Sequence, residues 1–151
     1  MLRTLTIIAL GLGLSAAAVQ AQQAGNAEDP IAKRRMLMRA NGAAAGLGGA
    51  MVKGEVPFSP AAANSVLSNF RAVGYTFGDY FPEGSQTGDT RALPRIWEDM
   101  AGFQAELADF RADAEAAIAA KPETLEAFQA AFATLGQDCQ SCHEKYRRPQ
   151  D

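Results

Sequence analysis

Both cysteines and the single histidine of the chain lie within five residues, in the run Cys139-Gln140-Ser141-Cys142-His143. On a helix, Cys139 and Cys142 are an i, i+3 pair, so both thiols point to the same side. Each thiol can then add to one vinyl group of a single porphyrin. His143 follows at once, where its imidazole can rise under the ring and bind the iron. The spacing predicts one covalently attached haem c, held by two thioethers and ligated by His143.

Three other interpretations of this run are weaker. A zinc site needs about four ligands, and the chain offers only two cysteines and one histidine. A thioredoxin-like dithiol belongs beside a βαβ pattern, which this sequence lacks. A plain disulfide leaves His143 without a role. A haem-free exported helical protein with a thiol switch is the alternative from another functional class.

The residues available to the other side of the iron are few. His143 is the only histidine, so two histidines cannot ligate one iron within this chain. Beyond residue 21 the methionines are Met36, Met38, Met51 and Met100. Met38 shares a helical stripe with small residues that leave room for a flat ring, namely Gly42, Ala45 and Gly49. Two interpretations stay open: the Met38 thioether binds the iron, or it only fills the pocket beside it.

The other methionines fit a distal position less well. Met36 lies about 160° from Met38 around the helix, at roughly 100° per residue. Met51 and Met100 fit apolar stripes and are expected to be packing residues. Arg34 lies one turn before Met38, where its guanidinium can pair with a haem propionate. The competing interpretation of Arg34 is a solvated surface charge.

Residues 1–21 have the pattern of a secretory signal peptide. A short basic start is followed by an apolar run over residues 5–14, and Val19-Gln20-Ala21 fits a cleavage site. The apolar run is too short for a membrane span. We therefore expect a mature chain of residues 22–151 that forms one domain, is exported to a bacterial periplasm and has no membrane span.

The charge and composition exclude several functions. The formal net charge of the whole chain is −3. Loss of the leader removes one basic residue, Arg3, and makes the mature chain slightly more acidic. Such a balance gives no reason to expect nucleic-acid binding. No nucleophile–base or acid–base pair stands out, so the sequence does not predict an enzyme.

Apolar residues recur at steps of three and four in four segments, which predicts four helices. The first begins at Asp29-Pro30, an N-cap followed by proline, and runs roughly to Lys53, with an apolar stripe of Leu37, Ala40, Ala44, Leu47 and Met51. The others are expected after Ser59-Pro60 up to Pro82, from Pro94 to Ala120, and from Pro122 to Tyr146. A turn-rich loop spans residues 83–90.

The predicted helices and their short connections favour an all-α fold, an antiparallel four-helix bundle with the haem near the C-terminal helix. The two cysteines continue the stripe of Phe128, Phe132 and Leu135 on their own helix. We therefore expect the haem motif to face the bundle interior.

With four predicted helices and a Cys-x-x-Cys-His motif in the last of them, the chain resembles a class II c-type cytochrome. That family places the motif in its last helix. Residues 34–42 resemble the first helix of that family, and residues 51–55 resemble the link after it. The run Leu93-Pro94-Arg95-Ile96-Trp97 resembles the start of the third helix. Residues 139–147, which end in His-x-x-Tyr-Arg, resemble the closing motif.

The resemblance implies electron transfer or the binding of diatomic gases. It places Met38 on the distal side of the haem, and residues 37–42 resemble the low-spin relatives in which this methionine is the sixth ligand. The alternative is a five-coordinate cytochrome c′ that binds nitric oxide or carbon monoxide. Arg147 matches an arginine beside the proximal face of the haem, although a cation also suits a helix C-terminus.

The sequence predicts binding partners in less detail than the haem site. The cluster Lys145, Arg147 and Arg148 is a candidate docking rim for an acidic redox protein. Many class II members are homodimers through their first two helices. Leu47 and Met51 are candidates for such an interface, but they fit the bundle interior equally well.

Overall fold

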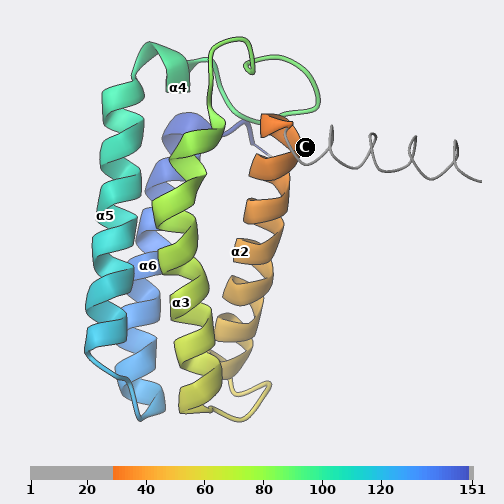
Figure 1. Ribbon diagram of the computed structural model, residues 1–151. Helices are drawn as coiled ribbons and strands as arrows, with labels where there is room; N and C mark the ends of the chain where they lie inside the picture. The colour runs from red at the N-terminus through yellow and green to blue at the C-terminus, as the bar shows by residue number, and fades with distance from the viewer. Residues whose placement is uncertain (1–28, 150–151) are drawn as a thin grey trace, which may run out of the picture.

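The computed structural model describes residues 29–149, which fold as a bundle of helices (Figure 1). The helices are α2 (Pro30–Val52), α3 (Pro60–Thr76), the 3-10 helix η1 (Phe77–Tyr80), α4 (Arg95–Glu98), α5 (Met100–Ala119) and α6 (Leu125–Tyr146). The predicted four-helix bundle is confirmed. Within residues 29–149 no helix is long and apolar enough to cross a membrane. The predicted signal peptide lies outside the described residues and stays a prediction.

Side-chain caps fix where the long helices begin. The Asp29 carboxylate accepts a hydrogen bond from the Ile31 amide at 2.9 Å, and Pro30 occupies the first helical position. Ser59 caps α3 in the same way, followed by Pro60. Such caps satisfy backbone amides that have no partner inside the helix. The last helix begins at Leu125, capped by Thr124, and not at Pro122 as the sequence suggested.

The second and third predicted helices are both interrupted near the same end of the bundle. The α-helical part of the second ends at Thr76 and continues as η1. The third divides into α4 and α5 at Asp99, whose φ of −132° and ψ of 56° leave the helical region. The Asp99 carboxylate accepts from the Gly102 amide at 3.1 Å and from the Tyr146 hydroxyl at 3.0 Å. The break therefore ties the start of α5 to the end of α6.

The core is largely aromatic. Phe70, Phe103 and Phe128 are each at most 1% exposed. Phe103 lies edge-on to Phe81 and to Tyr146, with ring centroids 4.7 and 5.3 Å apart. Edge-to-face pairs of this kind stabilise a core beyond the area that they bury. The apolar stripes predicted for α3, α5 and α6 are confirmed as the buried faces of these helices.

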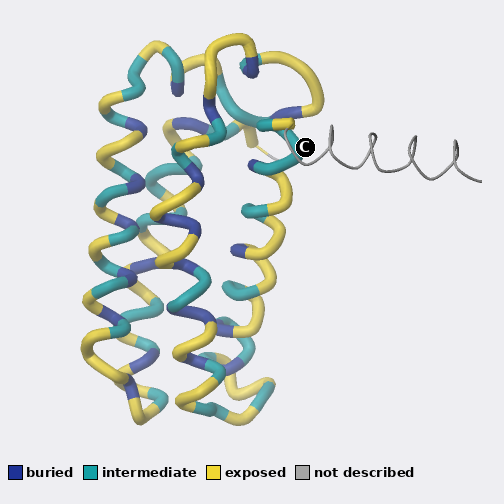
Figure 2. The backbone as a smooth tube through the Cα atoms, in the orientation of Figure 1, coloured by how far each residue is buried: buried dark blue, intermediate teal, exposed yellow. Residues whose placement is uncertain are grey.

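The predicted apolar stripe of α2 is confirmed only in part, since Leu37, Ala44 and Met51 lie in the core or pack against it. Of this stripe only Met51 is fully buried, while Leu47 is 42% exposed. Residues coloured as exposed accordingly line the outer side of α2 in Figure 2. The other buried residues of α2 are Arg34, Asn41 and Gly48. These residues are seven apart, so two turns of helix separate each from the next.

Alanine substitutions at two glycines, one beside the Asp99 cap and one away from it, test how much the cap contributes to stability. A Cβ at Gly102 would overlap the Asp99 carboxylate and lie 2.7 Å from the Tyr146 hydroxyl. We expect Gly102→Ala to lower the free energy of unfolding by about 1 kcal/mol or more, because the cap must shift. A Cβ at Gly136 would meet no atom within 4 Å. Gly136→Ala should therefore raise the free energy of unfolding by up to about 1 kcal/mol. Urea unfolding measures the free energy of unfolding of both variants. An equal increase in the two variants would contradict the role of the Asp99 cap and its contact with Tyr146.

The carboxylates between α5 and α6 predict a pH effect. Burial, and then Asp113, Asp109 and Glu106 on α5, raise the pKa of Asp138 from 3.8 to about 6. The folded chain therefore binds more protons than the unfolded chain between these values, and stability falls as the pH rises through them. Asp138→Asn should raise the free energy of unfolding at pH 7 by about 1 kcal/mol after solvent screening is allowed for.

Well below pH 3.8 this gain should vanish, since the carboxyl is then protonated in both states. Urea unfolding at about pH 3 and at pH 7 measures the difference. Glu126→Gln, at an exposed carboxylate of α6, is the control and should change little at either pH. An Asp138→Asn effect of equal size at both pH values would contradict the assignment.

Candidate haem-binding site

The predicted haem motif occupies the last two turns of α6. Cys139 and Cys142 are half-buried, their thiols are free, and both pack against the hydrophobic core. His143 is half-buried next to them. The apolar periodicity of α6 produces this arrangement, because the cysteines continue the side of the helix on which Phe128 and Leu135 are completely buried. The two thiols are therefore presented on one inward side of the helix, one turn apart.

The surroundings keep all three groups uncharged. Burial raises the pKa of the Cys139 thiol, and burial followed by the charge of Glu106 raises that of Cys142 to about 11. Burial, then the positive charges of Arg147 and Arg91, lowers the pKa of His143 to about 4. A neutral imidazole keeps the lone pair that a metal needs. Reactive thiols require the opposite, a lowered pKa in an exposed electropositive setting, so the site does not fit a thiol switch.

The chain that follows His143 is held in place by contacts with residues 91–93. At Arg147 the backbone leaves the helix, with φ −124° and ψ 135°, and forms an antiparallel bridge with Ala92. The Leu93 amide donates to the Tyr146 carbonyl at 3.0 Å, and the Arg148 amide donates to the Arg91 carbonyl at 2.9 Å. Sequence analysis missed this bridge, because residues 90–93 carry no strand pattern.

Met38 is half-buried and packs against the same hydrophobic core as the two cysteines. Met36 is 54% exposed and Met51 is 1% exposed, which agrees with the predicted outward and packing positions. α2 contacts α6 directly at the opposite end of the bundle, where Gln129 donates to the Val52 carbonyl at 3.2 Å. Met38 lies well before that contact, nearer to the end of the bundle that carries His143.

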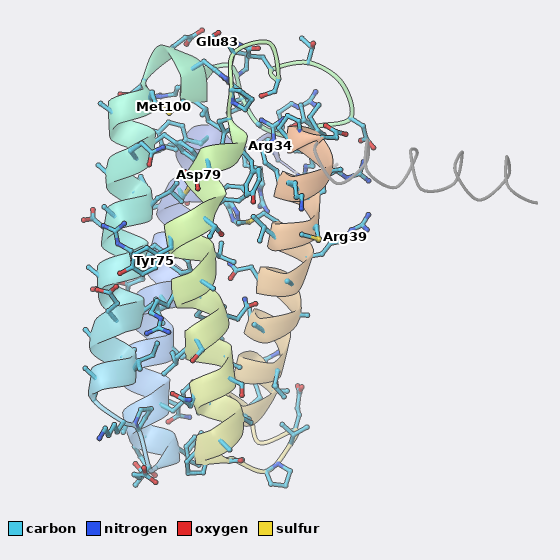
Figure 3. The ribbon with its side chains drawn as sticks, in the orientation of Figure 1. Arg34, Arg39, Tyr75, Asp79, Glu83 and Met100 are labelled. Atoms are coloured by element: carbon cyan, nitrogen blue, oxygen red, sulfur yellow. The ribbon has the colours of Figure 1, made fainter. Side chains whose placement is uncertain are left out.

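Arg34 is buried, at 4% exposure, so its interpretation as a solvated charge is wrong. Its guanidinium donates to the Ser85 carbonyl at 2.7 Å, and its Cζ lies 4.6 Å from the centre of the Phe81 ring. Figure 3 shows the contrast with Arg39, which points away from the bundle. Burial lowers the pKa of Arg34, and its Nε is buried without a partner among the described residues.

At the C-terminal end of α6, Arg147 also has a buried nitrogen without a hydrogen-bond partner in residues 29–149. It is half-buried, burial and the nearby charge of Arg91 lower its pKa, and its Nε has no partner among the described residues. Buried donors normally find an acceptor, and one left unpaired is costly. An anionic group could accept hydrogen bonds from the unpaired donors of both guanidinium groups.

These residues fit a haem. Two free thiols and a neutral imidazole share one side of α6, an apolar surface lies beside them, and two arginines have unsatisfied donors. No cluster of three or more His, Cys, Asp or Glu side chains suited to a metal ion is found in residues 29–149. The site thus has the donors of a covalently bound haem and lacks those of a protein-only metal site.

Comparison with known proteins agrees with this geometry. Residues 29–147 match the family model described as Cytochrome C'. The chain is 38% identical to cytochrome c-556 of Agrobacterium fabrum, over 97% of this chain and 95% of that protein.

Two solved structures share the fold. The structure of cytochrome c′ from Rhodopseudomonas palustris matches with a TM-score of 0.77 and 33% identity, over 82% of this chain and 98% of that one. An NMR-validated structural model of oxidized R. palustris cytochrome c556 matches with a TM-score of 0.74 and 28% identity, over 82% and 99%. The chain therefore belongs to the cytochrome c′ family, the class II c-type cytochromes.

Proposed function

We propose that this protein is a periplasmic electron carrier with one haem c, attached through Cys139 and Cys142, with His143 and Met38 as axial ligands. The observation that carries the proposal is the inward side of α6, where two free thiols and a neutral imidazole pack toward the core that Met38 also contacts. The bound haem would supply one-electron redox chemistry. The polypeptide supplies ligands, burial and charge.

Each residue has a defined part in this proposal. The thiols of Cys139 and Cys142 fix the ring to α6, and His143 binds the iron through its neutral imidazole. The soft thioether of Met38 raises the reduction potential relative to a second histidine. Arg34 would offer its unsatisfied donor to a haem propionate, and Arg147 would lie beside the proximal face. Arg34 is oriented for this by Ser85 and by the ring of Phe81.

The alternative is a five-coordinate cytochrome c′ in which Met38 only fills the distal pocket and the iron binds nitric oxide or carbon monoxide. The likeness to cytochrome c′ structures supports this alternative. Both forms use the same thiols and the same histidine. They differ in whether the sulfur of Met38 occupies the sixth position.

Surface features suggest the partners. Of the predicted docking cluster, Arg148 is exposed, Arg147 is half-buried, and Lys145 forms an ion pair with Glu106. This cationic end suits an acidic redox protein. Met51 is buried inside the bundle, which removes it as a candidate for a dimer interface. Leu47 is exposed and stays a candidate.

Carbon monoxide distinguishes the two forms. We expect the reduced holoprotein to bind carbon monoxide slowly and weakly, because the gas must displace the Met38 thioether. Met38→Ala should bind it rapidly and should convert the ferric spectrum from low spin to high spin. Flash photolysis and ferric absorption spectra measure these changes.

Met36→Ala is the matched control, since Met36 is an exposed methionine of the same helix and should leave both readouts unchanged. Rapid, complete binding of carbon monoxide by the unmodified protein would instead establish the five-coordinate alternative.

A further inference from the structure

Three of the four fully buried residues of α2 are an arginine, an asparagine and a glycine, and partly buried apolar residues of the helix pack beside them. Arg34, Asn41 and Gly48 follow one another at seven-residue intervals, the spacing at which helical residues return to nearly the same face. Each meets a different part of the molecule. Arg34 donates to the Ser85 carbonyl, Asn41 accepts from Asn69 of α3, and Gly48 lies against the ring of Phe132 of α6.

Each of these contacts exists at only one position of α2 along its axis. The Asn69 amide donates to the Asn41 side-chain carbonyl at 3.2 Å, and Asn41 is only 9% exposed. A shift by one residue moves a helical position by about 1.5 Å and rotates it by roughly 100°. Such a shift would leave a buried amide without its partner, which is unfavourable.

Gly48 adds a steric limit. A Cβ at this position would overlap the Phe132 ring, so with any larger residue here the ring or the helix would have to move. An apolar stripe of similar residues would permit sliding, whereas a single buried asparagine between helices is known to specify register. These contacts therefore give α2 a sharply defined position in addition to its apolar packing.

Met38 lies on α2 one turn before Asn41, so the same contacts determine where its sulfur lies. We propose that Asn41, through its hydrogen bond with Asn69, is a positioning residue that sets the height and rotation of α2 and thereby brings Met38 over the iron bound by His143. This inference rests on the proposed function, in which Met38 is an axial ligand. Asn41 itself touches neither the iron nor the porphyrin in this role.

The test compares ligation with stability in holoprotein variants. Asn41→Leu should stay folded, because leucine suits a buried helical position, but it should lose the fixed register. We expect the high-spin fraction of the ferric protein and the rate of carbon monoxide binding to rise about threefold to tenfold, the effect of losing about one hydrogen bond. Asn69→Ala removes only the donor, at a half-buried residue, and should act in the same direction if Asn41→Leu fails to fold.

Two controls separate positioning from a general loss of stability. Val66→Ala truncates a core residue of α3 that is 1% exposed, and should lower the unfolding midpoint without changing the spin state. Gly46→Ala alters α2 where no atom lies within 4 Å, and should change neither ligation nor gas binding. Asn41→Asp retains the acceptor oxygen and should restore part of the low-spin signal that Asn41→Leu loses.

The outcomes distinguish this proposal from the function on which it rests. A low-spin unmodified protein with an unchanged low-spin signal in both Asn41→Leu and Asn69→Ala would overturn the positioning role alone. An unmodified protein that is already high spin would overturn Met38 ligation, and the positioning role would fall with it.

Discussion

The inward orientation of the last two turns of α6 is the constraint on which the rest of the structure depends. Burial of Phe128 and Leu135 fixes the rotation of this helix, and the helical repeat then carries Cys139 and Cys142 to the same side. A rotation of α6 by one residue would turn the thiols by roughly 100° and expose apolar rings to water. The hydrophobic effect therefore sets the direction of the thiols as well as the fold.

The end of the bundle around His143 is stabilised differently. Here polar contacts join segments that are distant in sequence: Tyr146 with Asp99, Ala92 with Arg147, and Arg34 with Ser85. Figure 1 shows the long loop between η1 and α4 crossing the end of the bundle where α2 begins. This loop and the cap at Asp99 hold α6 at its C-terminus, which would otherwise be free to fray. The end that carries His143 is thus fixed by hydrogen bonds between distant segments as well as by the aromatic packing of Phe103 and Tyr146.

The sequence was sufficient for the elements whose buried faces are apolar. Periodicity located α3, α5 and α6 and placed the cysteines toward the core, because burial of Phe and Leu side chains dominates the free energy there. It was only partly right on α2, where Leu37 and Ala44 pack on the core as predicted. An arginine, an asparagine and a glycine are also buried there, and the leucine at position 47 is exposed.

Those burials depend on partners at Ser85, Asn69 and Phe132, which no local pattern reveals. The break at Asp99 was missed for the same reason, since the second acceptor role of Asp99 involves Tyr146, 47 residues away. A weak signal was present, because Asp99 followed three residues later by a glycine is compatible with an N-cap.

The most direct test of the central claim is denaturing mass spectrometry of the mature protein from cells competent in haem c attachment. The account predicts the mass of the polypeptide plus one haem, which is lost only when Cys139 and Cys142 are both replaced by serine. A mature chain without added haem mass, made in cells that attach haem to another c-type cytochrome at the same time, would contradict it.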